Sequence, residues 1–431
     1  MRQIDRLKIL LSDRLRFNKA ACRCVSRAIE LRETLRRPTN SIEIARSIKN
    51  LAKAGRGGFG LRDLRRLELK IQQLMRSWSP ADFGWDEFFR GTQSSCIGKS
   101  IILKKPQSVR EKGVLFVAFE THWIRLFRHA DLEALARDYD LVLSPTWSPP
   151  YDLAFFIASQ MWPNDLFTIL SNFGDVPTFR RISPRVRPIP LLASSWVNPE
   201  LLLSNGEPEK LFDIVMLANF SKYKRHFALF QALSRIDRRV KALLLGVSWE
   251  GRSLQTLENE AELFGVRDRI VIKEALPDAE MFQALRSAKV SVIMSLQEGS
   301  CVAVTESLFA GVPVGLLDSA RIGSRAFIND QTGRLLRSAA LAEDLADFVK
   351  HYGHYQPRRW ALNNGISCHE SAAYLNNYLK KTAFERGQSW TVDIAPMHWR
   401  PYGKFLSPQQ ETCMREEYRR FNFAYRVTID L

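Results

Sequence analysis

Long hydrophobic runs are missing from this sequence. No stretch of about 18 uninterrupted apolar residues occurs in its 431 residues, so no membrane-spanning helix is predicted. The first residues, "MRQIDRLKILLSDRLRF", carry charges throughout their apolar part, which argues against a secretory signal peptide. The six cysteines are scattered, with neither zinc-ligand spacing nor a dense disulfide pattern. We therefore expect a protein of the reducing cytoplasm.

Short repeats and low-complexity segments are also absent. With 45% hydrophobic and 11% aromatic residues the chain can bury sizeable cores, which excludes disorder along its whole length. Its length predicts two or three domains.

Positive charge is plentiful and unevenly placed. The formal net charge is +17, and residues 1–80 hold 20 Lys or Arg against 7 Asp or Glu, which gives this segment +13. Such a segment favours an anionic partner, either an acidic membrane surface, nucleic acid or an anionic polymer. The alternative is a solvated helical surface that happens to be rich in arginine.

Residues 1–95 form a predicted basic helical segment. Apolar residues recur at helical spacing among Arg and Lys in 4–17 and again in 61–78, with a break at 54–60. Basic amphipathic helices can lie on a membrane surface, or they can pack with their apolar side against the rest of the protein.

Beyond this segment, short apolar runs alternate with helical stretches in two successive series. Fully apolar strands separated by helices indicate parallel sheets covered on both faces. We therefore predict two doubly wound, Rossmann-like α/β units at 96–205 and 206–345, with a linker at about 201–211 and closing helices at 346–431 that cross back to the first unit. The predicted strands are 114–119, 141–146, 167–171 and 189–194, then 213–218, 241–247, 270–273, 290–294 and 312–317.

One candidate site lies in "SLQEGSCVAVTESLFAGVPVG", from Ser295 to Gly315. It follows a buried strand, where ligands of such sheets bind. Glu298 and Gly299 fall in the loop, and glycine allows close approach to the backbone. Ser300 is expected to cap a helix whose first amides, around Cys301 and Val302, suit a phosphate.

A second acid, Glu306, comes eight positions after Glu298. Eight residues of helix span about 12 Å, the scale of a nucleotide sugar with its diphosphate in the middle. Carboxylates accept hydrogen bonds from sugar and ribose hydroxyls. The alternative is a pair of helix-surface acids beside a tight turn.

The other candidate segment is "ANFSKYKRHFALFQAL" at 218–233, which follows the first strand of the second unit. Cations at a strand–helix turn suit a diphosphate leaving group, and we favour Lys224 and Arg225 over His226. A solvated basic turn is the alternative. Asn219 and the strand-end Gly246 complete the candidate donor-binding residues.

Together, these segments with "NDQTGRLL" (329–336) resemble the retaining family 4 type glycosyltransferases, also called glycosyl transferases group 1, which have the GT-B fold of two Rossmann-like domains facing a cleft. The resemblance is good over 213–345 and only architectural over 110–200. It implies that Glu298 contacts the transferred sugar and Glu306 the ribose. It implies also that Lys224, Arg225 and the Ser300–Cys301 backbone hold the diphosphate, with no cofactor and no metal.

Two positions depart from the family pattern. Cys301 stands where the family has glycine three residues after the first acid, and Asn219 stands where it often has arginine, so Lys222 or Lys224 must supply that cation.

In the first unit, His122 of "FETHWIRLF" follows a strand and could orient the donor or take the acceptor proton. A histidine packed against Trp123 is the alternative. Trp147 and 171–175 lie at other strand ends, where aromatic rings either stack on acceptor sugars or belong to the core. The Asp138–Tyr139–Asp140 segment and Trp399 are interpreted as structural.

The leading expectation is transfer of a sugar from a nucleoside-diphosphate sugar to a hydroxyl of a glycan or lipid-linked acceptor, as in polysaccharide or glycoconjugate synthesis. Retention of the anomeric configuration follows from the resemblance alone. The alternatives are a sugar-nucleotide epimerase with the GT-B fold and a basic protein that binds membrane or nucleic acid. For the enzyme we expect no nucleic-acid partner, and a cytoplasmic location that includes the inner face of the membrane through residues 1–80.

Overall fold

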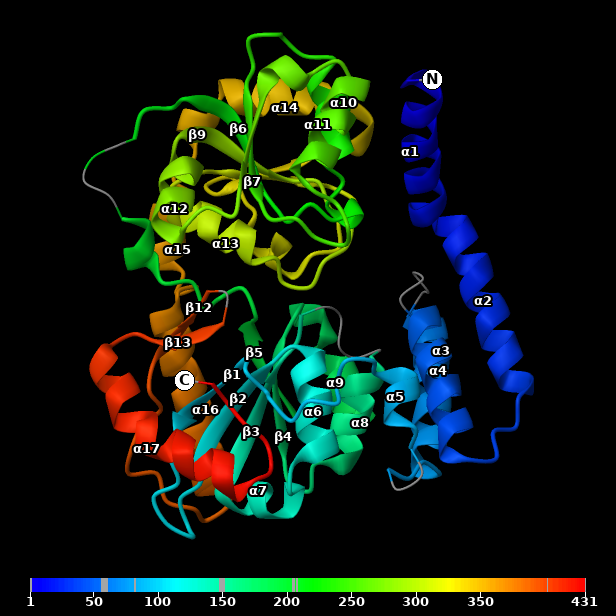
Figure 1. Cartoon of the computed structure of the whole chain (residues 1–431), viewed down its shortest axis with the longest axis vertical. Coiled ribbons are helices and arrows are strands. Elements are labelled where there is room, and N and C mark those ends of the chain that lie inside the picture. Colours follow the sequence, from blue (N-terminus) through cyan, green and yellow to red (C-terminus); the bar gives the residue numbers. More distant parts are fainter. Residues whose placement is uncertain are drawn as a thin grey trace. The chain divides into compact units, whose positions relative to one another are not determined.

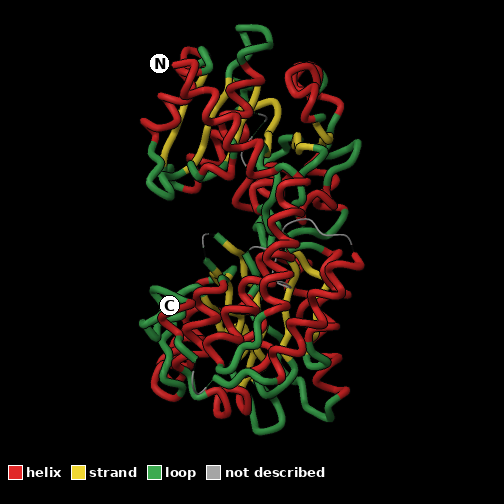
Figure 2. Tube along the Cα trace, turned by 90° about the vertical axis from the view of Figure 1, so that its right-hand side faces the viewer, coloured by secondary structure: helices red, strands yellow, loops and turns green. Residues whose placement is uncertain are grey.

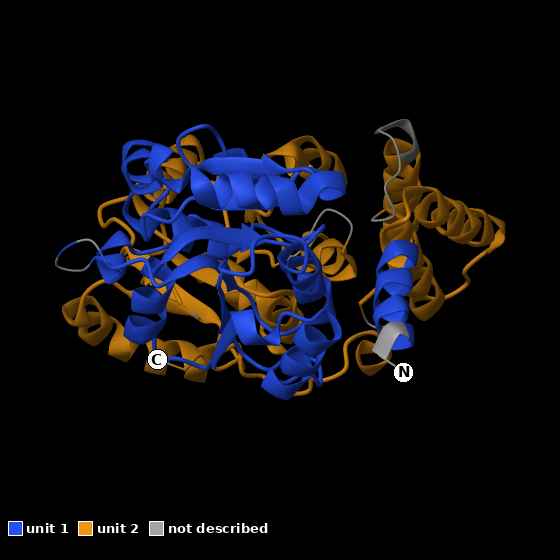
Figure 3. Ribbon diagram, turned by 90° about the horizontal axis from the view of Figure 1, so that it is seen from above, with its two compact units in different colours: residues 1–15, 194–370 blue, residues 16–193, 371–431 orange. Residues whose placement is uncertain are grey.

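The computed structural model describes residues 2–55, 61–80, 83–146, 152–203, 206, 208–400 and 402–430. It divides the chain into two compact units, each made of two separate stretches (Figure 3). Unit 1 holds residues 1–15 and 194–370, and unit 2 holds residues 16–193 and 371–431. In both units helices surround a mainly parallel sheet (Figure 2), which confirms the predicted α/β class with Rossmann-like units.

The sheet of unit 1 has six strands, and all of its described pairings are parallel. The five strands predicted from apolar runs are present within a few residues, and the sixth, β11, was not predicted. In chain order the strands are β6 (Phe212–Leu217), β7 (Ala242–Gly246), β8 (Ile270–Glu274), β9 (Ala288–Ile293), β10 (Val314–Leu317) and β11 (Gly333–Leu336).

The order of these strands across the sheet is β11-β10-β9-β6-β7-β8. The chain starts at the middle strand, winds outward through β7 and β8, and then returns to the other side of β6 with β9. The order therefore reverses between β6 and β9. In open parallel sheets this reversal opens a crevice beyond the carboxyl ends of the two strands, and ligands bind there.

Helices cover both faces of the unit 1 sheet (Figure 1). One face carries α10 (His226–Leu233), α11 (Leu254–Leu263) and α14 (Leu341–Lys350), and the other carries α12 (Asp278–Arg286), α13 (Val302–Phe309) and α15 (Pro357–Asn363). The first residues of α1 (Arg2–Phe17) also belong to this unit.

The sheet of unit 2 runs in chain order, β1-β2-β3-β4-β5. The four predicted strands are present and parallel, and β2, β3 and β4 are buried along their whole length. The antiparallel edge strand β1 was not predicted. The strands are β1 (Ser100–Lys104), β2 (Gly113–Ala118), β3 (Tyr139–Ser144), β4 (Leu166–Leu170) and β5 (Val186–Leu192).

A sheet that winds in one direction receives its connecting helices on one face. Here these are α6 (Glu120–His129), α7 (Leu132–Asp138), α8 (Leu153–Met161) and α9 (Val176–Ile182). The opposite face is covered by α16 (Cys368–Glu385) from the end of the chain (Figure 1), where Tyr378 packs on Phe167 of β4. The last helix, α17 (Pro408–Ala424), packs on Tyr139 at the start of β3. Arg386 after α16 pairs with Asp140 at 3.0 Å, so that the Asp138–Tyr139–Asp140 segment is structural.

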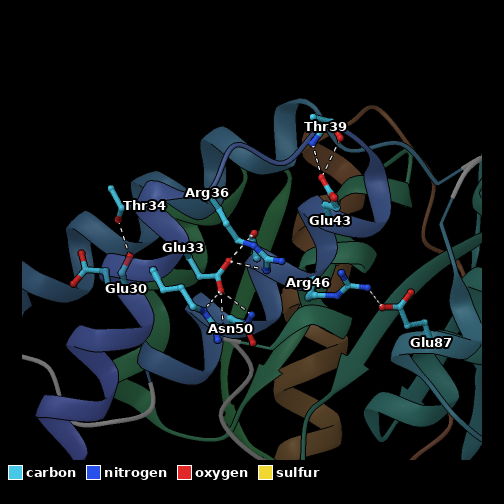
Figure 4. Close-up of polar contacts among 11 residues, drawn as sticks. Glu30, Glu33, Thr34, Arg36, Thr39, Glu43, Arg46, Asn50 and Glu87 are labelled. Carbon is cyan, nitrogen blue, oxygen red and sulfur yellow. Dashed lines mark hydrogen bonds and ion pairs between the residues drawn. The ribbon is translucent and has the colours of Figure 1, made fainter.

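The rest of unit 2 includes the helices α2 (Lys19–Leu35), α3 (Ser41–Gly55), α4 (Leu61–Arg76) and α5 (Trp85–Phe88). Buried acids hold α2 to its neighbours (Figure 4). Glu33 accepts hydrogen bonds from Ser47 at 2.8 Å and Asn50 at 2.9 Å on α3, while Glu30 pairs with Arg66 on α4 at 2.8 Å. The predicted break at 54–60 falls mostly outside the described residues. No helix in the described ranges is long and apolar enough to cross a membrane.

Candidate active site

The loop between β9 and α13 carries the first predicted acid. The backbone N–H of Glu298 donates to the carbonyl of Arg321 at 3.1 Å, and the carbonyl of Gly299 accepts from the N–H of Gly323 at 2.7 Å. These bonds hold the loop against a neighbouring segment of unit 1. The glycine therefore lies within a fixed backbone frame at the carboxyl end of β9.

Helix α13 begins at Val302 without a side-chain cap. The prediction that Ser300 caps it is wrong, because the Ser300 hydroxyl instead donates to the Ser194 hydroxyl at 2.7 Å and accepts from the Ser194 N–H at 2.9 Å. The residue before the helix, Cys301, has left-handed backbone angles (φ 54°, ψ 82°). A helix start without a capping side chain leaves its first N–H groups for another acceptor, and phosphate is the ligand such amides prefer.

The second acid, Glu306, lies on α13 one turn after Val302 and is only 5% exposed. The Glu298 side chain is 9% exposed. Two acids on a helix surface would be solvated, so this alternative interpretation of the pair is wrong. Helix α13 ends at Phe309, and Gly311 after it has φ +74°.

The loop between β6 and α10 carries the cations. Its Lys224 forms an ion pair with Glu298, with Nζ 2.7 Å from Oε2, and its Arg225 donates from Nη1 to the carbonyl of Met294 at 2.9 Å. Both contacts cross from the end of β6 to the end of β9, the point where the strand order reverses. Burial lowers the pKa of Lys224, but the carboxylate of Glu298 outweighs this effect and keeps the pKa above its usual value.

Arg225 has a second charged partner. Its guanidinium binds both carboxylate oxygens of Asp13 on α1, from Nε at 2.8 Å and from Nη2 at 2.9 Å. Like Cys301, Arg225 precedes a helix in a left-handed conformation (φ 58°). Non-glycine residues adopt this conformation only at an energetic cost, and such strained residues gather at functional sites.

His226 is the first residue of α10 and is almost completely buried. Burial lowers its pKa to about 3, with a smaller effect from the positive charges of Arg252 and Lys224, so the ring is neutral. Neither ring nitrogen has a hydrogen-bond partner among the described residues.

Further buried polar atoms without a partner in the described part of the chain belong to the same loops and to α13. Most buried polar atoms in proteins are hydrogen-bonded, so a group of orphaned ones indicates a place for water or a ligand. Three of the residues that carry these atoms, Ser221, Ser295 and Thr305, were not predicted, because a single serine or threonine forms no distinctive sequence pattern. The atoms are Oε1 of Glu298 and the hydroxyls of Ser221, Ser295 and Thr305.

Two further predicted donor-binding residues have local structural partners. The side-chain oxygen of Asn219 accepts from the N–H of Ser221 at 3.3 Å, which shapes the loop after β6. A Cβ added at Gly246 would lie 2.1 Å from the carbonyl oxygen of Ala218. Gly246 is therefore needed for the close approach of the ends of β6 and β7, whether or not it contacts a ligand.

His122 lies in unit 2, whereas the other predicted site residues lie in unit 1. It follows Phe119, which has φ 67° at the end of β2, and its ring is 6.4 Å from the Phe119 ring. Burial and the charge of Arg125 lower its pKa to about 4, so the imidazole is neutral. Trp147 lies outside the described residues, and Trp399 packs on Phe119 with ring centroids 5.8 Å apart.

Comparisons with known proteins agree with this description of unit 1. Residues 198–364 match the family model "Glycosyl transferases group 1". This range contains the whole unit 1 sheet, both acids and the Lys224–Arg225 pair. No curated protein matches the chain.

Several solved structures are similar to the chain at low sequence identity. Sucrose-phosphate synthase from Thermosynechococcus elongatus is 16% identical, with a TM-score of 0.48, over 63% of this chain and 74% of that one. Anabaena HepE in complex with UDP and glucose is 14% identical, with a TM-score of 0.49, over 63% and 78%. The pneumococcal O-GlcNAc transferase GtfA in complex with UDP and GlcNAc is 17% identical, with a TM-score of 0.45, over 59% and 54%.

The sheet order, the reversal between β6 and β9, and the family match over 198–364 lead to one assignment. Residues 198–364 of the chain carry a glycosyl transferases group 1 domain.

Proposed function

We propose that this glycosyltransferase uses a nucleoside-diphosphate sugar as its donor and transfers the sugar to a hydroxyl group of a glycan or a lipid-linked glycan. The observation that carries the proposal is the grouping at the ends of β6 and β9. The buried Glu298, two cations and an uncapped helix start meet there, and the buried Glu306 lies on that helix. Several buried polar atoms of these loops have no hydrogen-bond partner among the described residues.

Each group in this set has a chemical task in the proposal. The amides of Val302 and its neighbour, with Lys224 and Arg225, bind the diphosphate and stabilise the charge that develops as it leaves. Glu306 accepts hydrogen bonds from the ribose hydroxyls, and Glu298 accepts them from the sugar. Because side chains and backbone supply the positive charge, the proposal requires no bound metal and no cofactor.

In the reaction, the bond between the anomeric carbon and the phosphate oxygen breaks, and a bond to the acceptor oxygen forms. The acceptor loses its hydroxyl proton, and the nucleoside diphosphate leaves with the bonding electrons. We propose retention of the anomeric configuration and His122 as a candidate acceptor of the proton, since its imidazole is neutral.

The test is binding and transfer in Glu306→Gln and Lys224→Ala variants. Losing one hydrogen bond to a charged group weakens binding by about 1.5–3 kcal/mol, so we expect uridine diphosphate (UDP), the first ligand of a nucleotide panel, to bind about 10–100-fold more weakly. Glu280→Gln, on the exposed surface of α12, is the matched control. Full binding and full transfer rates in both site variants would remove the proposed donor site. An epimerised donor formed without any acceptor would instead identify a sugar-nucleotide epimerase.

We also propose that the protein works at an acidic membrane surface through α1. Four apolar side chains at helical spacing lie on this helix and remain solvent-exposed. Residues 1–80 are strongly basic, and a basic helix with an exposed apolar stripe favours an anionic lipid surface. The stripe consists of Ile4 (58% exposed), Leu7 (56%), Leu11 (49%) and Leu15 (70%).

Vesicle sedimentation tests the membrane proposal. The protein should bind vesicles of phosphatidylglycerol and phosphatidylcholine but not phosphatidylcholine alone, and a Leu7→Ser/Leu11→Ser variant should lose this binding. Leu69→Ser, which changes an exposed leucine of α4, is the control. Equal retention of the double variant and the parent protein would show that α1 is not the membrane contact.

A further inference from the structure

The N-terminal helix reaches the candidate diphosphate site. Asp13 of α1 and Arg225 before α10 are 212 positions apart in the sequence, yet both carboxylate oxygens contact the guanidinium. The side chains of the pair are only 17% and 13% exposed. This geometry, with two parallel N–H···O bonds, is the one arginine uses for carboxylates and phosphates alike.

A second contact belongs to the same face of α1. The guanidinium of Arg6, seven positions before Asp13, lies over the ring of Phe264 at the end of α11, 4.8 Å from its centroid. Residues seven apart on a helix share a face, and the exposed Leu7–Leu11 stripe is on another face. The contacts between α1 and the rest of unit 1 thus include one ion pair and one cation–π contact. The cation–π contact is worth about 0.5–2 kcal/mol. The ion pair is partly buried, but it uses the N–H groups of Arg225 that a phosphate can also bind.

With α1 in this position, both cations proposed for the diphosphate already face a carboxylate. Lys224 is paired with Glu298, and Arg225 is paired with Asp13. A diphosphate brings further negative charge to the same place. Like charges a few ångströms apart in a partly buried site repel strongly, so the diphosphate and the Asp13 carboxylate compete for Arg225.

We propose that Asp13 is a tethered competitor of the donor, and that α1 in its docked position lowers the affinity of the site for the nucleoside diphosphate. This inference rests on the proposed function and adds a regulation of the same site. Donor binding then requires Asp13 to leave Arg225. By thermodynamic linkage the reverse also holds, so a bound nucleoside diphosphate weakens the docking of α1 by the same factor.

The experiment compares three full-length proteins by calorimetric titration with UDP at constant ionic strength. They are the parent protein, Asp13→Asn and Asp5→Asn. Asp5 lies on the same helix and pairs locally with the exposed Lys8 at 3.2 Å, so its variant controls for the loss of one negative charge from α1. We expect Asp13→Asn to bind UDP about 10-fold more tightly, because the competing state has been weakened. Asp5→Asn should match the parent protein.

Hydrogen exchange of the α1 amides gives an independent readout. UDP should speed this exchange in the parent protein and leave it unchanged in Asp13→Asn, where α1 is already released. If Asp13→Asn binds UDP as the parent does, or more weakly, then Asp13 does not compete and the inference is wrong while the donor site stands. If none of the three proteins binds UDP or another nucleotide of the panel, the proposed donor site fails, and the inference fails with it.

Discussion

Lys224 and Glu298 form an ion pair 2.7 Å long that joins the end of β6 to the end of β9, with side chains only 13% and 9% exposed. The two residues come from loops 74 positions apart in the sequence. Their contact joins the loops that follow two paired strands, and these strands are not consecutive in the chain. The pair therefore has a structural role in addition to the ligand-binding role proposed for each partner.

Breaking this pair from one side should destabilise unit 1. Lys224→Met leaves a buried carboxylate without its cation, and losing one partner of a buried pair typically costs about 3–5 kcal/mol. Replacing both partners, as in Lys224→Met/Glu298→Gln, removes the uncompensated charge and should restore much of the lost unfolding free energy. Urea denaturation of the parent protein, both single variants and the double variant measures this coupling. Simple addition of the two single effects would show that the partners do not interact.

The strained residue before α13 gives a second prediction. Cys301 has φ 54°, where a side chain costs about 1–2 kcal/mol and glycine does not. Cys301→Gly should therefore be more stable than Cys301→Ala by about 1 kcal/mol, although both variants lose the thiol. Thermal unfolding of the two variants measures the difference. A more stable alanine variant would mean that the left-handed backbone is not maintained in solution.

Most strands of both units could be predicted because each contains a short apolar run, the pattern of a buried strand. The edge strand β1 was not predicted, since "SIILK" is followed by charged residues and pairs antiparallel outside the alternation that marked the other strands. The sequence also does not state strand order. The reversal between β6 and β9, which brings Lys224 to Glu298, is a property of the assembled sheet.

Several features of the candidate site have no local signal at all. Serine often caps helices, but the hydroxyl of Ser300 is hydrogen-bonded to Ser194, more than a hundred positions earlier in the sequence. Asp13 is one of many charged residues on a basic helix, and only the folded chain selects it as the partner of Arg225. Local patterns thus predicted the elements and the acids, while long-range contacts determined which polar groups meet.

Gly246 allows a prediction about the backbone at the ends of β6 and β7. A methyl group there would lie 2.1 Å from the backbone oxygen of Ala218 and 2.9 Å from the ring of Phe220, so β6 and β7 would have to separate. Gly246→Ala should lower the free energy of unfolding by about 1–3 kcal/mol or more, as measured by urea denaturation. Gly353→Ala is the control, because no atom lies within 4 Å of the added methyl group. Equal stability of the two variants would contradict the close approach of the two strand ends.

The buried pair of Lys104 and Glu111 in unit 2 predicts a specific acid sensitivity. The two charges are 2.7 Å apart, and the side chains are 0% and 3% exposed. Burial raises the pKa of Glu111, but the ammonium of Lys104 and the hydrogen bonds from Thr391 and Val392 outweigh it and lower the pKa to about 2. Because this pKa lies below the ordinary value of 4.5, the pair contributes stability above about pH 4.5 and loses it as the pH falls toward 2.

The contribution lost between these pH values is on the order of 3 kcal/mol. Glu111→Gln cannot titrate, so its stability should fall less steeply between pH 5 and pH 3 than that of the parent protein. Its stability at neutral pH should be lower, because the ammonium of Lys104 stays buried without its partner. Glu416→Gln, on the exposed side of α17, controls for the loss of an ordinary carboxylate. Urea unfolding at a series of pH values measures the slopes, and a parent protein whose slope equals that of Glu111→Gln would show that the pair does not depend on the charge of Glu111.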